Sequence, residues 1–346
     1  MNSTIFREYD IRGLVPQELN PETMGLIGKA FGTHLRSLNL KNISVGGDVR
    51  THTRGLMDAF IAAVNSTGID VIDIGFVTSP LCYFSAFHLP VDGLAMITAS
   101  HNPKQYNGVK LGVGKTTMFG SDITHIRDLA IKGQFATGAG KTVKQDITED
   151  YIAYLATKFK FSRKIKMVLD PANATGALFA KRVFERVGAD VVSIYDTVDG
   201  NFPNHHPDPT VAENVVDLGK KVVELGREVG IGLDGDSDRV GVIDEKGNLI
   251  PGDLLTLIFA KDDNHAEEIV ATAREVFGKG NDFATKITYN ARDAKQLHFQ
   301  AHRKRLILSH RFWRLSKKHK PGVGGLPRLD TRDGLTSETI FKTNPK

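Results

Sequence analysis

Three aspartates lie two residues apart in 234-DGDSDR-239, directly after the apolar run 230-GIGL-233. Side chains at i, i+2 and i+4 of an extended or looped segment can converge on one cation, and carboxylate oxygens suit a hard ion such as Mg²⁺. An ordinary surface turn is disfavoured because three adjacent carboxylates repel one another unless a cation neutralises them. Asp234, Asp236 and Asp238 are therefore candidate Mg²⁺ ligands, and Arg239 is a candidate donor to a phosphate beside the ion.

A second candidate is Ser100, which follows the apolar run 94-LAMI-97 in the segment 97-ITASHNPKQYNGVK-110. Ligands of open α/β sheets bind beyond the carboxyl ends of strands, so a serine at this place could accept a phosphoryl group. Serine alone is a poor nucleophile, and His101 or Lys110 could supply a base or a fixed positive charge. The Asn-Pro and Asn-Gly pairs of the segment also fit an ordinary turn.

A third candidate is the N-terminal segment 6-FREYDIRG-13, which contains Tyr9 and Arg12. A solvated, mobile terminus is the usual alternative for such a segment. The segment becomes relevant to chemistry if it folds back onto the Ser100 loop.

Two better-known motifs are excluded. The three aspartates and Glu245 have EF-hand spacing, but Arg239 occupies the position that requires glycine and the flanking residues resemble strands. The segment 112-GVGKTT-117 lacks the first glycine of a P-loop, because residue 109 is valine.

Apolar, β-branched runs alternate with amphipathic stretches through the first 260 residues, which predicts an α/β fold with parallel sheets. Helices are expected from Asn20-Pro21 to about 38, from Thr53 to about 67 and from Thr175 to 188. The stretch 133–146 is rich in Gly, Thr and Lys and resembles a linker, and a second boundary is expected near 244–253. Strands are expected at 43–48, 69–75, 94–100, 165–170, 190–196 and 230–236.

The charge of the 346-residue chain is unevenly distributed. Of its 45 Lys and Arg and 40 Asp and Glu, 15 and 4 respectively fall within residues 286–346. A nucleic-acid partner for the basic, aromatic run 302–320 is one interpretation of this tail, and an unfolded basic tail is the other. One cysteine, no apolar run of about 20 residues and no signal-peptide pattern favour a cytoplasmic protein without a membrane partner.

The segments Phe6–Gly13, Thr98–Lys110 and Asp234–Arg239, in this order and spacing, resemble the signatures of the alpha-D-phosphohexomutase family. The opening FREYDIRG is more similar to phosphomannomutase/phosphoglucomutase than to phosphoglucosamine mutase, which stays open as an alternative. The stretch 199-DGNFPNHHPDPTVAEN-214 also resembles the segment that precedes the metal loop in that subfamily. The resemblance covers about residues 5–260.

The resemblance implies successive mixed or parallel-sheet α/β domains of the phosphohexomutase type. Domain I is expected at 1–143, domain II at 144–248, and an incomplete or altered domain III with the basic tail at 249–346, with the fourth domain absent. Ser100 would be the phosphoserine and would complete the Mg²⁺ shell of the three aspartates. The residues implied around the transferring phosphoryl group are Tyr9, Arg12, His101, Lys110 and Arg239.

The implied reaction interconverts the 1- and 6-phosphates of mannose and glucose, with a hexose 1,6-bisphosphate as activator and a monomer favoured. However, the family's G-E-M-S-G-H sugar loop and R-x-S-N-T-x-P phosphate loop are missing from residues 249–346. A changed reading frame or a fused tail is expected there. Impaired turnover and a non-catalytic, Mg²⁺-binding fragment therefore both remain open.

Overall fold

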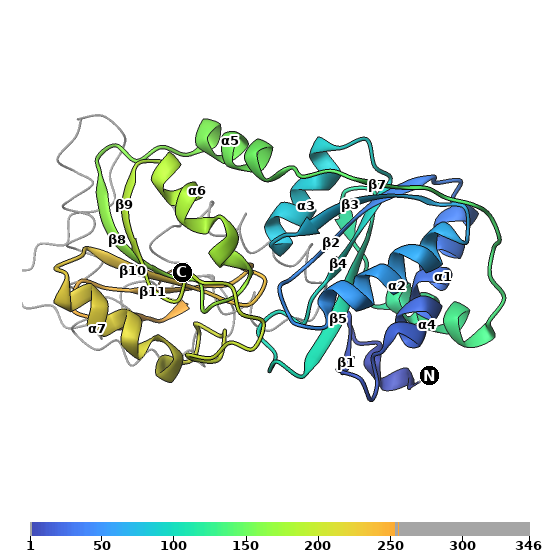
Figure 1. Ribbon diagram of the computed structural model, residues 1–346, viewed down its shortest axis with the longest axis horizontal. Helices are drawn as coiled ribbons and strands as arrows, with labels where there is room; N and C mark the ends of the chain where they lie inside the picture. The colour runs from blue at the N-terminus through green and yellow to red at the C-terminus, as the bar shows by residue number, and fades with distance from the viewer. Residues whose placement is uncertain (1, 253–254, 256–346) are drawn as a thin grey trace, which may run out of the picture. The chain divides into compact units, whose positions relative to one another are not determined.

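The computed structural model describes residues 2–252 and 255 of the chain, and residues 1–250 form one compact unit (Figure 1). The predictions for the altered third domain and for the basic tail lie outside the described residues. Among the residues that the structure does describe, no helix is both long and apolar enough to cross a membrane.

The first sheet is mixed and has the strand order β1-β5-β4-β2-β3-β7, with β6 paired to β5. Strands β4, β2, β3 and β7 run parallel, whereas β5 is antiparallel to both β4 and β1. The carboxyl ends of the parallel strands therefore meet at one edge, where ligands of such sheets bind. The strands are β1 Ile11–Leu14, β2 Asn42–Gly47, β3 Asp70–Phe76, β4 Gly93–Ile97, β5 Tyr106–Val113, β6 Thr116–Thr117 and β7 Thr142–Lys144.

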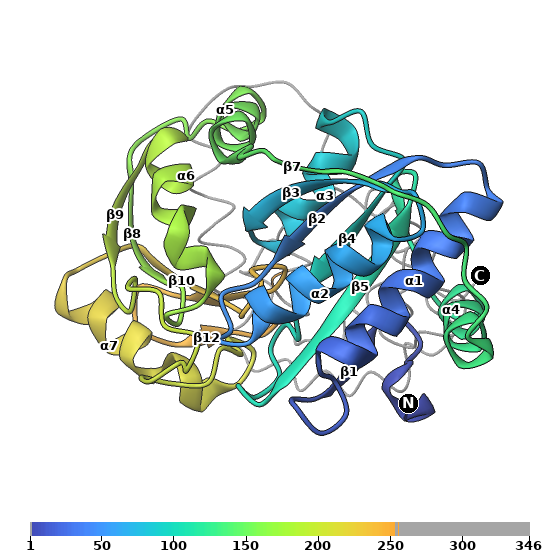
Figure 2. The same ribbon diagram turned by 45° about the vertical axis from the view of Figure 1, so that its right-hand side comes forward.

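Helices cover both faces of this sheet, α1, α2 and α4 on one and α3 on the other (Figure 2). Strand β4 shows why, because successive side chains of a strand point to opposite faces. Ala95 and Ile97 pack in the core with α1 and α2, while Leu94 and Met96 pack in the core with α3. The helices are α1 Pro21–Ser37, α2 Thr53–Asn65, α3 Ser79–His88 and α4 Ser121–Lys132, and a 3₁₀ turn, Ser3–Ile5, precedes β1.

The second sheet has the order β12-β11-β10-β8-β9, in which β10, β8 and β9 are parallel. Met167 and Leu169 of β8 pack in a core with α6, and Val168 between them packs in a core with α7. Helix α5 contacts both α6 and α3. The elements are α5 Thr148–Lys158, β8 Ile165–Asp170, α6 Ala180–Arg186, β9 Ala189–Ser193, α7 Val216–Glu224, β10 Val229–Leu233, β11 Val240–Ile243 and β12 Leu249–Ile250, with 3₁₀ turns at Thr175–Leu178 and Ala212–Val215.

The six predicted strands are present as β2, β3, β4, β8, β9 and β10, and the sheets are mixed as expected. The helix expected from Thr53 is α2, which begins at that residue, and the Thr53 hydroxyl donates to Asp48 at 2.6 Å. The helix expected from Thr175 is a 3₁₀ turn followed by the shorter α6.

The linker-like stretch 133–146 contributes a strand. Its residues 142–144 form β7, which pairs with β3 at the edge of the first sheet. A strand at a sheet edge needs only its backbone groups to pair, so a polar sequence can form one. Strand β7 spans the predicted boundary at 143/144, which stays a prediction.

Candidate functional site

Ser100 lies in the loop after β4, where the sheet's parallel strands end. Its backbone is left-handed, with φ of 50°, which is uncommon for a residue with a side chain. The Ser100 amide donates to Thr98 Oγ1 at 2.9 Å, and the side chain is buried. In this conformation the hydroxyl donates to Asp234 Oδ2 at 2.7 Å. A non-glycine residue kept in such a region is a feature of functional loops.

The aspartate loop follows β10 and is folded around Asp234. One carboxylate oxygen of Asp234 accepts the amides of Asp238 and Arg239, each at 3.0 Å, which leaves the other oxygen for Ser100. Gly235 lies against the Ser100 carbonyl, because a Cβ at this position would be 2.3 Å from that oxygen. The two loops are therefore in direct backbone contact.

Asp234, Asp236 and Asp238 each offer an oxygen, and these atoms lie within 4.8 Å of one another. Asp234 and Asp236 are fully buried, and Asp238 is exposed. Burial, followed by the charges of the other two carboxylates, raises the pKa of Asp234 well above its ordinary value. Asp236 Oδ1 is buried and has no hydrogen-bond partner among the described residues. An orphaned carboxylate oxygen beside two others fits a hard divalent cation such as Mg²⁺.

Lys110 reaches the same cluster from β5. Its Nζ lies 2.7 Å from Asp236 Oδ2, 2.6 Å from Asp238 Oδ2 and 3.3 Å from Ser79 Oγ. Burial alone would lower the pKa of Lys110, but the charge of Asp236 raises it well above its ordinary value. Burial alone would raise the pKa of Asp236, but the charge and the hydrogen bond of Lys110 lower it. The ammonium group thus acts as a counter-ion of the cluster.

The N-terminal segment folds back onto the Ser100 loop, since β1 pairs antiparallel with β5. Arg12 Nη1 donates to Asn102 Oδ1 at 2.8 Å, and Nη2 contacts Asp10. The Arg12 Nε is buried without a partner among the described residues. Tyr9 precedes this pair and its side chain is 44% exposed.

His101 and Arg239 lie at the rim of the same site. The His101 ring is half-buried, and its Nδ1 has no hydrogen-bond partner among the residues described. Burial, followed by the charge of Arg239, lowers the pKa of His101. The Arg239 side chain is exposed, with Nε 4.0 Å from Asp238 Oδ1.

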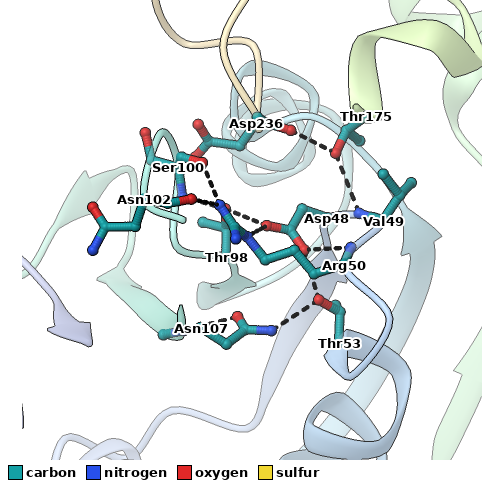
Figure 3. Close-up of polar contacts among 12 residues, drawn as sticks. Asp48, Val49, Arg50, Thr53, Thr98, Ser100, Asn102, Asn107, Thr175 and Asp236 are labelled. Carbon is teal, nitrogen blue, oxygen red and sulfur yellow. Dashed lines mark hydrogen bonds and ion pairs between the residues drawn. The ribbon is translucent and has the colours of Figure 1, made fainter. Parts of the chain in front are cut away.

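Sequence reasoning missed several residues of this site. Arg50 and Asp48 form a buried ion pair beneath the Ser100 loop (Figure 3). Ser79, at the start of α3, donates its hydroxyl to Asp236 Oδ2 at 2.6 Å. Asp208 is buried and accepts hydrogen bonds from Thr210, and the charges of His101 and Arg239 contribute to the lowering of its pKa. The available signal was the placement of Asp48 and Arg50 directly after a buried strand, as with Ser100 and Asp234.

Comparisons with known proteins cover this part of the chain. Residues 3–137 match the family model described as phosphoglucomutase/phosphomannomutase, alpha/beta/alpha domain I, and residues 149–247 match that of domain II. A phosphomannomutase/phosphoglucomutase of Pseudomonas syringae pv. tomato is 38% identical over 259 residues, 75% of this chain and 56% of that protein. A phosphoglucomutase of Neisseria meningitidis serogroup B is 35% identical over 260 residues, with the same two shares.

Solved structures give the same result. A phosphoglucomutase/phosphomannomutase family protein from Burkholderia thailandensis superimposes with a TM-score of 0.73 at 32% identity, over 79% of this chain and 60% of that one. In both kinds of comparison the chain spans a little over half the length of the proteins it matches.

Proposed function

Because this chain belongs to the phosphoglucomutase/phosphomannomutase family, we propose that it transfers phosphoryl groups between Ser100 and hexose phosphates. The overall reaction interconverts the 1- and 6-phosphates of mannose and glucose. The observation that carries this proposal is the 2.7 Å hydrogen bond from the Ser100 hydroxyl to Asp234, inside a cluster of three carboxylates. It joins a candidate phosphate acceptor to a candidate metal site.

The proposed sequence has two transfers. In the first, phosphorylated Ser100 gives its phosphoryl group to the free hydroxyl of a hexose monophosphate, the Ser100 oxygen leaves, and a hexose bisphosphate forms. The proton of the attacking hydroxyl passes to His101, whose Nδ1 has no partner among the described residues, and the leaving Ser100 oxygen takes up a proton from water. Lys110 stays protonated throughout and supplies a fixed positive charge. After the sugar reorients, the other phosphate returns to Ser100. A hexose 1,6-bisphosphate would therefore act as an activator by phosphorylating Ser100.

The protein's task in such a transfer is mainly positioning and charge neutralisation. Arg12, Arg239 and Lys110 supply cationic groups around Ser100, and Tyr9 lies three residues before Arg12 in the chain. Asp234, Asp236 and Asp238 would bind Mg²⁺, together with an oxygen on Ser100. When bound, the ion would stabilise the negative charge of the phosphoryl oxygens.

A metal-binding chain with slow turnover is the second candidate, favoured by the sequence of residues 249–346, which contains neither the family's sugar loop nor its phosphate loop. A mutase must bind the distal phosphate and the sugar hydroxyls in two opposite orientations, and residues 249–346 lack the family's sequences for both tasks. Positioning contributes several orders of magnitude to a rate. We therefore expect the 346-residue chain to turn over well below the usual range of about 1–10³ per second.

The test separates transfer to serine from turnover. Purified protein with Mg²⁺ and glucose 1,6-bisphosphate is expected to gain one phosphoryl group, which peptide mapping places on Ser100. Ser100→Ala should gain none, and the matched control Ser37→Ala, at the exposed end of α1, should gain as much as the parent. Phosphate on another residue, with Ser100 unmodified, would refute the proposal. A coupled assay with mannose 1-phosphate and glucose 1-phosphate then measures turnover.

A further inference from the structure

Arg50 is the largest fully buried side chain among the described residues, although it carries a charge. Its Nε donates to Asp48 Oδ2 at 3.1 Å. Its two terminal nitrogens donate to three backbone carbonyls of the serine loop, those of Ser100 at 2.7 Å, Asn102 at 2.7 Å and Pro103 at 2.8 Å. Figure 3 shows the guanidinium group between Asp48 and this backbone.

This arrangement suits arginine in particular. A buried charge is costly unless it is paired and hydrogen-bonded, and here both conditions are met. The planar fork of a guanidinium directs donors toward several acceptors at fixed angles, which the ammonium of lysine cannot do. Since the three acceptors all belong to residues 100–103, the fork defines the path of the backbone that leaves Ser100 in its left-handed conformation.

Residues 48–50 also contact the segments that support the aspartate loop. The Arg50 guanidinium lies 5.1 Å from the centre of the Phe202 ring. Gly200 packs so closely that a Cβ there would be 2.4 Å from the Val49 carbonyl. Thr175 Oγ1 donates to the Gly235 carbonyl at 2.8 Å and accepts the Val49 amide at 3.3 Å. Residues 48–50 therefore lie between the serine loop and the segments that support the aspartate loop.

We infer that Arg50 is a positioning residue, which fixes the conformation of the Ser100 loop and its register against the aspartate loop. It contacts no reacting atom. Its consequence for phosphoryl transfer rests on the proposed function, whereas its effect on the loop does not. Misplacing a reacting group by about 1 Å can reduce a rate by roughly 10²-fold. A change at Arg50 should therefore lower the maximal rate of Ser100 phosphorylation and leave half-saturation nearly unchanged.

Two Arg→Lys variants form the test. Arg50→Lys keeps the charge but loses the fork. The matched control Arg54→Lys lies four residues on, and among the described residues Arg54 forms ion pairs with Asp58 and Asp73. Two quantities are measured on the full chain, the rate of Ser100 phosphorylation by glucose 1,6-bisphosphate with Mg²⁺ and the hydrogen exchange of residues 99–106. The Asn102 amide, bonded to the Ala99 carbonyl at 3.0 Å, is the reporter.

Arg50→Lys is expected to slow phosphorylation by about 10²-fold and to speed exchange at Asn102 at least about tenfold, which Arg54→Lys should not do. If Arg50→Lys behaves like Arg54→Lys in exchange, the inference is overturned. If it does not fold, the double variant Asp48→Asn/Arg50→Met replaces it, since that removes both buried charges, with the same expectations. A parent that gains no phosphate refutes the proposed function alone, and exchange still decides the role of Arg50.

Discussion

The Ser100 loop and the aspartate loop both follow parallel strands, yet they are stabilised in opposite ways. The Ser100 loop is fixed from beneath by Arg50, a cation with no exposed side-chain surface. The aspartate loop has a cation above it, Lys110, which is 12% exposed and contacts an exposed carboxylate. One cation is part of the scaffold and the other stands where a metal ion would compete. The first loop is therefore preorganised, and the second should respond to ions.

The most complete expected loss concerns that response. Asp236→Asn removes one of the three candidate ligands, so it should abolish the Mg²⁺-dependent rise in Tm. For the parent, Mg²⁺ at a hundred times its Kd stabilises the folded state by about 2.7 kcal/mol, which corresponds to several °C. Thermal melts with and without Mg²⁺ measure the difference. Asp128→Asn, an exposed change on α4, is the control, and a parent-like shift in Asp236→Asn would remove the metal assignment.

Lys110→Met tests whether the lysine ammonium competes with Mg²⁺ at the aspartate loop. Removing one partner of a largely buried ion pair costs about 3–5 kcal/mol, so the metal-free variant should unfold at a clearly lower temperature than the parent. Its Mg²⁺-dependent rise in Tm should be larger, because no ammonium then competes for Asp236 and Asp238. Lys132→Met, at the exposed end of α4, should change neither quantity. An unchanged Mg²⁺ response in Lys110→Met would show that the lysine does not compete with the ion.

Gly235→Ala tests whether the two loops must touch. The added Cβ would be 2.3 Å from the Ser100 carbonyl, so the loops must separate. The rate of Ser100 phosphorylation should fall by about 10²-fold. The control is Gly55→Ala in α2, where a Cβ meets nothing within 4 Å and alanine favours the helix. Equal rates in the two variants would show that the contact is not needed.

The sequence predicts the two loops because Ser100 and Asp234 each follow a buried strand. The rule that ligands bind at the carboxyl ends of strands marks each loop separately, whereas only the family resemblance implies that Ser100 lies beside the three aspartates. The rule does not predict Arg50, because a charged pair after a strand has the same appearance as a solvated turn. Only the burial of that pair, with side chains 0% and 1% exposed, distinguishes the two cases.

Strand β5 shows a second limit. Asn107-Gly108 has the composition of a turn but lies inside β5. The tertiary contacts explain the difference. The Asn107 amide group donates to Thr53 Oγ1 at 2.9 Å, and a Cβ on Gly108 would be 2.3 Å from the Ile11 carbonyl of β1. Both residue types are required by neighbours far away in the sequence, which local turn chemistry cannot reveal.

The smallest expected effect concerns the segment that carries Phe202 against Arg50. His205 Nε2 lies 2.9 Å from Asp170 Oδ2, at the end of β8. Burial alone would lower the pKa of His205, but the hydrogen bond and charge of Asp170 raise it, with smaller contributions from the His206 carbonyl and from Asp217. A histidine whose pKa is higher in the folded state stabilises that state fully below its unfolded pKa of about 6.5. This contribution disappears as the pH rises through the folded pKa.

His205→Asn removes the titrating group, so the parent should be the more stable protein near pH 6, by less than about 1 kcal/mol because the ring is partly solvated. The difference should shrink as the pH rises above 6.5, since the parent alone loses its ion pair. Urea unfolding across this range measures the difference in unfolding free energy, with His88→Asn, an exposed histidine that faces Asp150, as the control.

Hydrogen exchange at the Asn102 amide should stay constant over the same range once the intrinsic pH dependence of exchange is removed, because Arg50 remains charged throughout. If the exchange rate of the Asn102 amide changed with pH, the conformation of the Ser100 loop would depend on residues 199–206 more than on Arg50.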